Sequence, residues 1–156
     1  MEIIVNGSEV LSRCGFLYLA MEVRTGKTLT SLGIAERLGL NSVLFITKKK
    51  AMSSIDSDFK MMQPSPIFLH VVNYESLHKI PNLSWDLVVC DEAHTLGAFP
   101  KPSKRAKQVH KIVGAAGRPM VMLLSGTPTP ESYSQMYHQV YGIVGNPFGR
   151  YKNFYR

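Results

Sequence analysis

The residues Gly26, Lys27 and Thr28 stand at a point of the chain that suits the binding of phosphate groups. The apolar run 16–20 before them predicts a buried strand, and the apolar spacing of 27–38 predicts a helix. A loop in this position directs backbone N–H groups of the helix N-terminus at a phosphate, and the glycine lets the backbone approach closely. Lys27 would reach the β- and γ-phosphates of a nucleotide, and the Thr28 hydroxyl would bind Mg²⁺.

The loop departs from the G-x-x-x-x-G-K-[ST] pattern, because Met21 stands where the first glycine is expected. A Gly-Lys-Ser/Thr triplet alone occurs by chance in roughly one chain in ten of this length. The strand before the loop and the helix after it therefore add weight to the prediction. The nucleotide-binding residues predicted from this loop are Met21, Glu22, Val23, Arg24, Thr25, Gly26, Lys27 and Thr28.

Two adjacent carboxylates, Asp91 and Glu92, follow the apolar run 87–90. In a site that cleaves a phosphate bond, Asp91 would hold Mg²⁺, usually through water, and Glu92 would orient and activate the attacking water. The predicted catalytic residues are thus Glu92, Lys27 and Asp91. The alternative is a solvated strand end that carries two acids, and the coincidence with a phosphate loop makes that alternative less favoured.

The histidines do not indicate a further metal site. His94 lies just beyond the carboxylate pair, and a lone histidine is more often a surface or capping residue than a catalytic one. A zinc site needs further ligands at close spacing, and His70, His78 and His110 are scattered along the chain. Mg²⁺ is therefore the one metal that the sequence predicts.

Five short apolar runs must position these side chains. They predict strands over 16–20, 43–46, 68–72, 87–90 and 120–124, and helices are predicted over 27–38, 53–60 and 131–141. Because the apolar runs are continuous rather than alternating, we expect a mainly parallel sheet covered by helices on both faces. This order predicts an α/β doubly wound fold, in which ligands bind at the carboxyl ends of the strands.

The composition bounds the class of protein. The chain has 156 residues, of which 45% are apolar, which predicts one domain with a core rather than a disordered tail. A formal net charge of +7 favours an anionic partner. No run approaches the ~18 apolar residues of a membrane span, and no signal peptide opens the chain, so we expect a cytoplasmic protein without a membrane partner. Cys14 and Cys90 lie in runs that predict strands, and we expect buried free thiols.

Several stretches together resemble the first RecA-like domain of superfamily 2 helicases. The segment from Trp85 to His94, which ends in Asp-Glu-Ala-His, is similar to motif II, and Ser125-Gly126-Thr127-Pro128 is similar to motif III. The phosphate loop is similar to motif I, the stretch 43–48 to motif Ia, and 72–77 to the region near motif Ib. The order and spacing of these motifs match the family over nearly the whole chain.

The resemblance implies a three-layer RecA-like P-loop NTPase domain that uses ATP and Mg²⁺. Within the superfamily the chain is most similar to Swi/Snf-type translocases, especially small phage-encoded ones. The similarity lies in local sequences such as residues 21–28 and 146–149. Such proteins hydrolyse ATP to move along duplex or forked DNA, and a phage protein would act in the host cytoplasm. In the family, motif III bonds to the motif II loop and links the nucleotide site to DNA contacts. The residues that the resemblance assigns to this coupling are His94, Ser125 and Thr127.

Some features of the family are missing from the sequence. Arg24 stands where motif I usually has a glycine, and no glutamine motif precedes it. Motifs IV to VI are absent, so we expect residues 1–156 to form a single ATP-binding domain without the second RecA-like domain that carries the arginine fingers. An arginine supplied from elsewhere is worth ~10³–10⁵ in rate. We therefore expect weak ATP binding and very slow hydrolysis unless a second domain acts in trans.

Basic residues mark two candidate contacts for nucleic acid. Lys48, Lys49 and Lys50 follow a strand in the motif Ia region, and Asn73 and Tyr74 follow another near motif Ib, where the family contacts the DNA backbone. The span 95–130 holds no acidic residue, and three of its lysines share one helical face. Solvated turns and helix faces are the alternative in both places. The lysines of the second contact are Lys104, Lys107 and Lys111.

The leading hypothesis is the ATP-binding motor domain of a DNA helicase or translocase, with little sequence preference for its DNA. A non-catalytic nucleotide- or DNA-binding module, left from a split or degenerate helicase, is the alternative. The missing second domain favours that module, whereas the intact Lys27, Thr28, Asp91 and Glu92 favour the motor. A small P-loop kinase is a third reading, and the Ser-Gly-Thr-Pro turn gives it no support.

Overall fold

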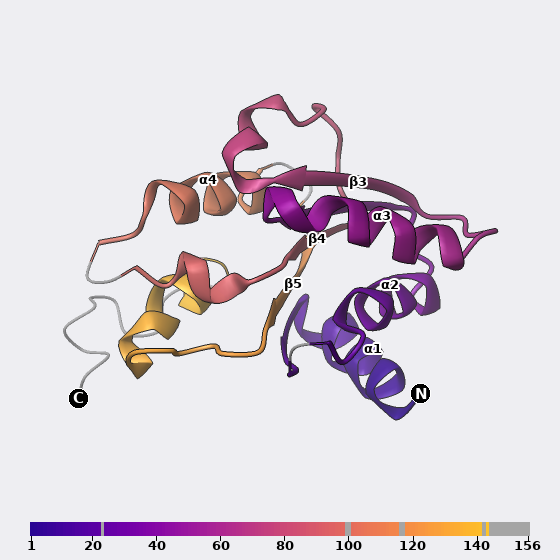
Figure 1. The fold of residues 1–156 in the computed structure, drawn as a ribbon, viewed down its shortest axis with the longest axis horizontal. Helices are drawn as coiled ribbons and strands as arrows, with labels where there is room; N and C mark the ends of the chain where they lie inside the picture. The colour runs from indigo at the N-terminus through magenta and orange to yellow at the C-terminus, as the bar shows by residue number, and fades with distance from the viewer. Residues whose placement is uncertain (23, 99–100, 116–117, 142, 144–156) are drawn as a thin grey trace.

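A five-stranded parallel sheet forms the middle of the protein in the computed structural model (Figure 1). The structure describes residues 1–22, 24–98, 101–115, 118–141 and 143. The strand order is β1-β5-β4-β2-β3, and all four neighbouring pairs are parallel, which confirms the predicted α/β class and the expected sheet. The strands are β1 (Phe16–Ala20), β2 (Ser42–Thr47), β3 (Phe68–Asn73), β4 (Leu87–Cys90) and β5 (Met120–Ser125).

Helices cover both faces of this sheet and make a three-layer structure. On one face lie α1 (Glu2–Cys14), α2 (Lys27–Arg37) and α3 (Met52–Met61), which share a buried cluster with the sheet. On the other face α4 (Lys104–Val113) packs with short 3₁₀ segments at the ends of the strands. The segments η2 (Tyr74–Lys79) and η3 (Ala93–Leu96) contribute to the buried cluster on this face. Two further 3₁₀ segments are η1 (Lys49–Ala51), which leads into α3, and η4 (Tyr133–Gln135), which follows β5.

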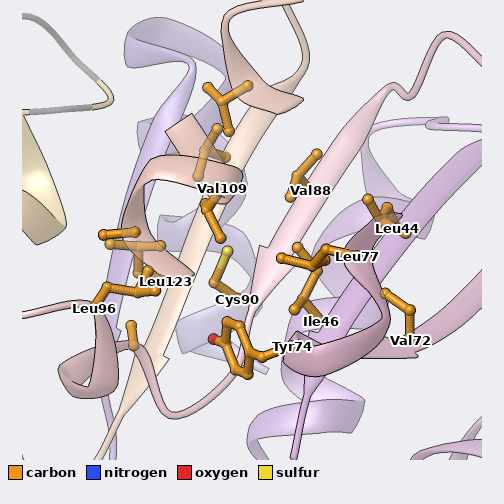
Figure 2. Close-up of a cluster of buried hydrophobic side chains, with 14 of the residues drawn as sticks. Leu44, Ile46, Val72, Tyr74, Leu77, Val88, Cys90, Leu96, Val109 and Leu123 are labelled. Atoms are coloured by element: carbon orange, nitrogen blue, oxygen red, sulfur yellow. The ribbon is translucent and has the colours of Figure 1, made fainter. Parts of the chain in front are cut away.

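Neighbouring residues of one strand serve opposite cores, which explains the continuous apolar runs. In β2, Val43 and Phe45 belong to the cluster under α1 to α3, whereas Leu44 and Ile46 belong to the cluster under α4. Figure 2 shows the second cluster, to which Leu44 and Ile46 of β2 and Val109 of α4 all contribute. Each such side chain contributes about 1.5–3 kcal/mol when it is fully buried. The two cores therefore fix the sheet and the edge where its strands end.

The first helix was not predicted from the sequence. Helix α1 ends at Gly15, which has a left-handed φ of 67° and whose N–H donates to the Leu11 carbonyl at 2.8 Å. A Cβ added at Gly7 would lie 2.7 Å from Ile34 Cδ1, so the glycine lets α1 approach α2 closely. Cys14 is the exposed last residue of this helix, so its predicted burial in a strand is wrong.

The predicted helix over 131–141 is also wrong in kind. The chain there forms η4 and then a π-helical turn, η5 (Tyr137–Tyr141). The fully buried Gln139 donates its side-chain Nε2 to the Gln135 carbonyl at 2.9 Å, a group that would accept a backbone N–H in an α-helix. The other predicted helices are confirmed as α2 and α3, with ends shifted by one residue. No helix in the described ranges is long and apolar enough to cross a membrane.

Candidate functional site

The loops that carry the predicted chemistry meet at one edge of the sheet. All strands are parallel, so their carboxyl ends lie together, and β1, β5 and β4 are consecutive neighbours. Ala20 of β1 lies opposite Ser125 of β5, and Cys90 of β4 lies opposite Leu123. The phosphate loop, the Ser-Gly-Thr-Pro turn and the carboxylate pair therefore leave the sheet side by side.

The phosphate loop curls back on itself before α2. Gly26 is the N-cap of α2 with a left-handed φ of 79°, and Arg24 has a φ of 64° although it carries a side chain. The Thr25 hydroxyl donates to the Glu22 carbonyl at 2.6 Å. Gly26 as N-cap offers no side chain to the first turn of α2, so the N–H groups of that turn lack the usual side-chain cap and suit an anion. Val23, another predicted nucleotide contact, lies outside the described residues.

The Lys27 side chain folds back toward the phosphate loop. Its Nζ donates to the Met21 carbonyl at 3.4 Å, so the ammonium lies where a bound phosphate would accept from it. Met21 therefore takes part through its backbone, while its side chain packs against the core beneath α1 to α3. Burial is the largest effect on the pKa of the Asp91 carboxyl and raises it, while the Lys27 charge opposes that rise more weakly.

Two hydrogen bonds orient the Asp91 carboxylate. The hydroxyl of the fully buried Thr47 donates to Oδ2 at 2.8 Å, and the Glu92 backbone N–H donates to Oδ1 at 2.9 Å. Burial raises the pKa of Asp91, the Thr47 bond opposes it, and the charge of Glu92 raises it further. Thr47 was not predicted to belong to the site. It ends β2, and the register that pairs Ile46 with Cys90 brings it beside Asp91.

Glu92 is held in a strained backbone conformation. Its φ of 52° and ψ of 45° are left-handed, which costs a residue with a side chain ~1–3 kcal/mol. The side chain is 32% exposed, and its Oε2 lies 3.5 Å from Nδ1 of His94. The turn thus separates the two carboxylates: Asp91 is tied to β2, whereas Glu92 stays open to water.

His94 and Ser125 connect the carboxylate loop to the Ser-Gly-Thr-Pro turn. Nδ1 of His94 lies 2.9 Å from Oγ of Ser125, which is the bond expected between the two loops. The same Oγ accepts the backbone N–H of Thr127 at 3.1 Å. Ser125 is fully buried, whereas Thr127 is exposed and contributes here through its backbone. The contact is present, and the coupling role of these residues stays a prediction.

The residues predicted to contact nucleic acid near motifs Ia and Ib gather in one hollow. Lys48, Lys49, Lys50 and Asn73 line it together with Glu75 and Ser76, and it encloses about 540 Å³. The Asn73 Oδ1 is buried without a hydrogen-bond partner among the described residues, while its Nδ2 lies 3.7 Å from the Met52 sulfur. The three lysines that line this hollow form a surface suited to an anionic chain such as a phosphate backbone.

Tyr74 lies elsewhere than the sequence predicted. It is only 2% exposed, its hydroxyl donates to the Asp91 carbonyl at 2.5 Å, and the Arg105 guanidinium lies 4.6 Å over its ring. Burial raises the pKa of Tyr74 well above its ordinary value, so the hydroxyl keeps its proton as a donor. Its ring packs beside Cys90 and Ile46 (Figure 2). Tyr74 therefore supports the carboxylate loop and is not a surface contact for nucleic acid.

Tyr74→Phe tests this assignment. We expect the free energy of unfolding to fall by about 1 kcal/mol, because one buried hydrogen bond to the Asp91 carbonyl is lost. The affinity for a DNA oligonucleotide should stay within about twofold, because the side chain is buried. Urea unfolding and fluorescence anisotropy measure the two effects, with Lys49→Ala as the comparison that weakens DNA binding. A tenfold weaker DNA affinity in a folded Tyr74→Phe protein would contradict the assignment.

The second set of lysines occupies the solvent face of α4. Lys104, Lys107 and Lys111 are all exposed, which confirms that they share one face. Arg105 points away from that face and pairs with Glu75 at 2.9 Å. Lys111 also lines a separate, largely apolar hollow of about 380 Å³ with Leu77, Leu83 and Trp85 among its walls. The structure thus places the α4 lysines outside the lysine-lined hollow at the end of β2 and β3.

The residues at the carboxyl edge fit Mg²⁺ bound with a nucleotide. This ion needs one or two carboxylates, with water and phosphate oxygens completing its shell. Asp91 offers two oxygens that each accept one hydrogen bond from the chain and keep a lone pair. Thr28 lies in the first turn of α2, directly after the phosphate loop. Among the described residues no group of three His, Cys, Asp or Glu gathers around a common point.

Comparison with known proteins adds no relative to this picture. No protein-family model matches the chain, and no curated protein matches it. The likeness to superfamily 2 helicases therefore stands on the motifs in the chain itself. Of those stretches, 146–149 lies outside the described residues.

Proposed function

We propose that this chain is the RecA-like ATP-binding motor domain of a superfamily 2 helicase or translocase, which couples Mg-ATP hydrolysis to movement on nucleic acid. The observation that carries the proposal is that the loop of Lys27 and the Asp91–Glu92 pair leave the same edge of a parallel sheet, on strands that both neighbour β5. The bond from His94 to Ser125 adds a link from that pair to a neighbouring loop. Fold alone supports many functions, so the weight rests on these side chains.

Each residue has a part in the proposed reaction. Lys27 exchanges the Met21 carbonyl for phosphate oxygens, which are stronger acceptors because they are charged. Asp91, oriented by Thr47 and by the Glu92 N–H, would hold Mg²⁺ together with Thr28. When bound, the ion neutralises charge on the phosphates. Glu92, which is partly exposed and has its Oε2 3.5 Å from His94 Nδ1, would orient water and accept its proton.

Hydrolysis by this chain alone is expected to be slow. No arginine of the chain is assigned to the phosphates, apart from Arg24 in the loop, and the resemblance places the arginine fingers in a second RecA-like domain. Such an arginine increases the rate of hydrolysis by ~10³–10⁵-fold. We propose that a second domain, joined to this one or supplied by a partner, completes the site.

Nucleic acid is the proposed track of this motor, and DNA follows from the resemblance. The net charge of +7 and the lysine-lined hollow suit a phosphate backbone. Contacts of this kind carry no sequence information, so binding is expected to be independent of sequence. Within superfamily 2, Swi/Snf-type and phage-encoded translocases are the most similar members in the sequences of these motifs.

Lys27→Ala tests the nucleotide site directly. We expect its affinity for a fluorescent ATP analogue with Mg²⁺ to fall by about 10–100-fold, because charge-assisted hydrogen bonds to phosphate contribute ~1.5–3 kcal/mol. Lys60→Ala is the matched control, because it removes the same charge from an exposed position at the end of α3. Equal affinities in the two variants would refute the assignment of the phosphate loop.

A second measurement separates the motor from a binding module. Phosphate release from ATP is followed with and without a DNA oligonucleotide, alone and with an added second RecA-like domain. Stimulation by DNA supports the motor. Nucleotide binding without release under any of these conditions would favour the non-catalytic module instead.

A further inference from the structure

A buried amide lies where three segments of the proposed site meet. Gln139 in η5 is fully buried, and its Nε2 donates to the Pro128 carbonyl at 2.8 Å and to the Gln135 carbonyl at 2.9 Å. Its Oε1 accepts the hydroxyl of Tyr18 at 2.6 Å. Both donors and the acceptor of the amide are thus in use, which is how a buried polar side chain avoids a desolvation penalty.

The residues that contact this amide belong to the segments that carry the parts of the proposed site. Tyr18 lies in β1, which runs directly into the phosphate loop. Pro128 follows Ser125 and Thr127, and Gly97 follows the segment that starts at Glu92. A Cβ added at Gly97 would lie 2.9 Å from Nε2 of Gln139 and 2.9 Å from the Gln135 carbonyl oxygen, so this loop rests directly on the amide.

The Tyr18 hydroxyl is a dependable donor to this junction. Burial raises the pKa of Tyr18 to about 12, so the hydroxyl stays protonated at neutral pH. Gly97 has a φ of −84°, which any residue adopts, so space rather than backbone freedom explains a glycine there. The junction is therefore close-packed as well as fully hydrogen-bonded.

We propose that Gln139 is a positioning residue that couples the phosphate loop to the Ser125–Thr127 turn and the carboxylate loop. The proposal rests on the proposed function, because it assigns the junction a role in passing nucleotide binding to the nucleic-acid surface. Gln139 touches neither reactant. It holds the three segments in one register, so that they move together when phosphates occupy the loop.

The test is a coupling measurement on the full chain. The affinity for a DNA oligonucleotide is measured with and without a non-hydrolysable ATP analogue and Mg²⁺, and the ratio of the two dissociation constants is the readout. We expect a ratio of about 5 or more in the unaltered chain. Gln139→Met keeps the length of the side chain but removes its hydrogen bonds, and should bring the ratio to near one, with the nucleotide affinity alone within about threefold.

Two milder variants test the same junction if Gln139→Met folds poorly. Tyr18→Phe removes one donor, with Tyr133→Phe as the control for an exposed hydroxyl. Gly97→Ala removes no polar group, but its added Cβ would lie 2.9 Å from Nε2 of Gln139 and would displace the amide. Both Tyr18→Phe and Gly97→Ala should lower the ratio, whereas Tyr133→Phe should leave it unchanged.

The outcomes separate this proposal from the one on which it rests. An unchanged ratio in folded variants, or a ratio of one in an unaltered chain that binds both ligands, would overturn the coupling role. A loss of affinity for both ligands that only tracks lost folding, in circular dichroism, would reduce Gln139 to a structural residue. Failure of the unaltered chain to bind nucleotide at all would instead overturn the proposed function.

Discussion

Replacing Glu92 with glutamine should lower the rate of ATP hydrolysis by about 10²–10⁴-fold while nucleotide still binds. Glutamine has the same shape and can occupy the same left-handed backbone conformation, so the loop should fold as before. It cannot accept a proton from the attacking water, which is the role that remains for a carboxylate left open to solvent. The change therefore removes chemistry rather than structure.

The measurement is phosphate release in a single turnover at saturating DNA, with binding of a fluorescent ATP analogue followed in parallel. Glu36→Gln is the matched control, because it removes the same charge from an exposed position near the end of α2. A Glu92→Gln protein that hydrolyses ATP as fast as the control would show that the activity arises at another site. A loss of nucleotide binding together with hydrolysis would show that Glu92 acts in binding.

The sheet and the place of the site follow from patterns in the sequence. Continuous apolar runs predict strands covered on both faces, and the two cores that share β2 are the physical cause of that pattern. Lys27 and Asp91 were predicted to meet because parallel strands bring their carboxyl ends to one edge. This prediction needs only the positions of the strands and their parallel direction, and not side-chain detail.

The supporting residues could not be predicted, because they depend on register and packing. Thr47 reads as the polar end of an apolar run, and only the pairing of Ile46 with Cys90 places it on Asp91. Tyr74 stands beside the polar Asn73, yet its ring turns into the core under α4. Helix α1 was missed because Gly7 and Ser8 interrupt its pattern, although both are buried against neighbouring elements.

The region after Ser125 shows a local preference overridden by a buried polar contact. The sequence over 131–141 favours an α-helix, but the chain forms a π-helical turn in which the Gln139 amide donates to the Gln135 carbonyl. A glutamine in a helical pattern reads as a solvent-exposed residue. Its burial depends on Tyr18, which lies more than a hundred residues away in the chain.

Removing the three lysines at the end of β2 should have the largest effect on DNA binding. Lys48→Ala, Lys49→Ala and Lys50→Ala combined should weaken binding by roughly 10–100-fold at low salt and lower the slope of log affinity against log salt by about 2–3. These three lysines line one hollow, so a phosphate backbone can contact several of them at once.

The matched variant combines Lys104→Ala, Lys107→Ala and Lys111→Ala on α4. It removes the same three charges, so any effect of net charge alone is equal in the two proteins. Its lysines lie on the solvent face of a helix and outside that hollow, and we expect its salt slope to change by less than about one. Anisotropy titrations between low and moderate salt measure both slopes. Equal losses would mean that the backbone also runs along α4, and binding insensitive to salt in the unaltered chain would contradict a phosphate contact at either surface.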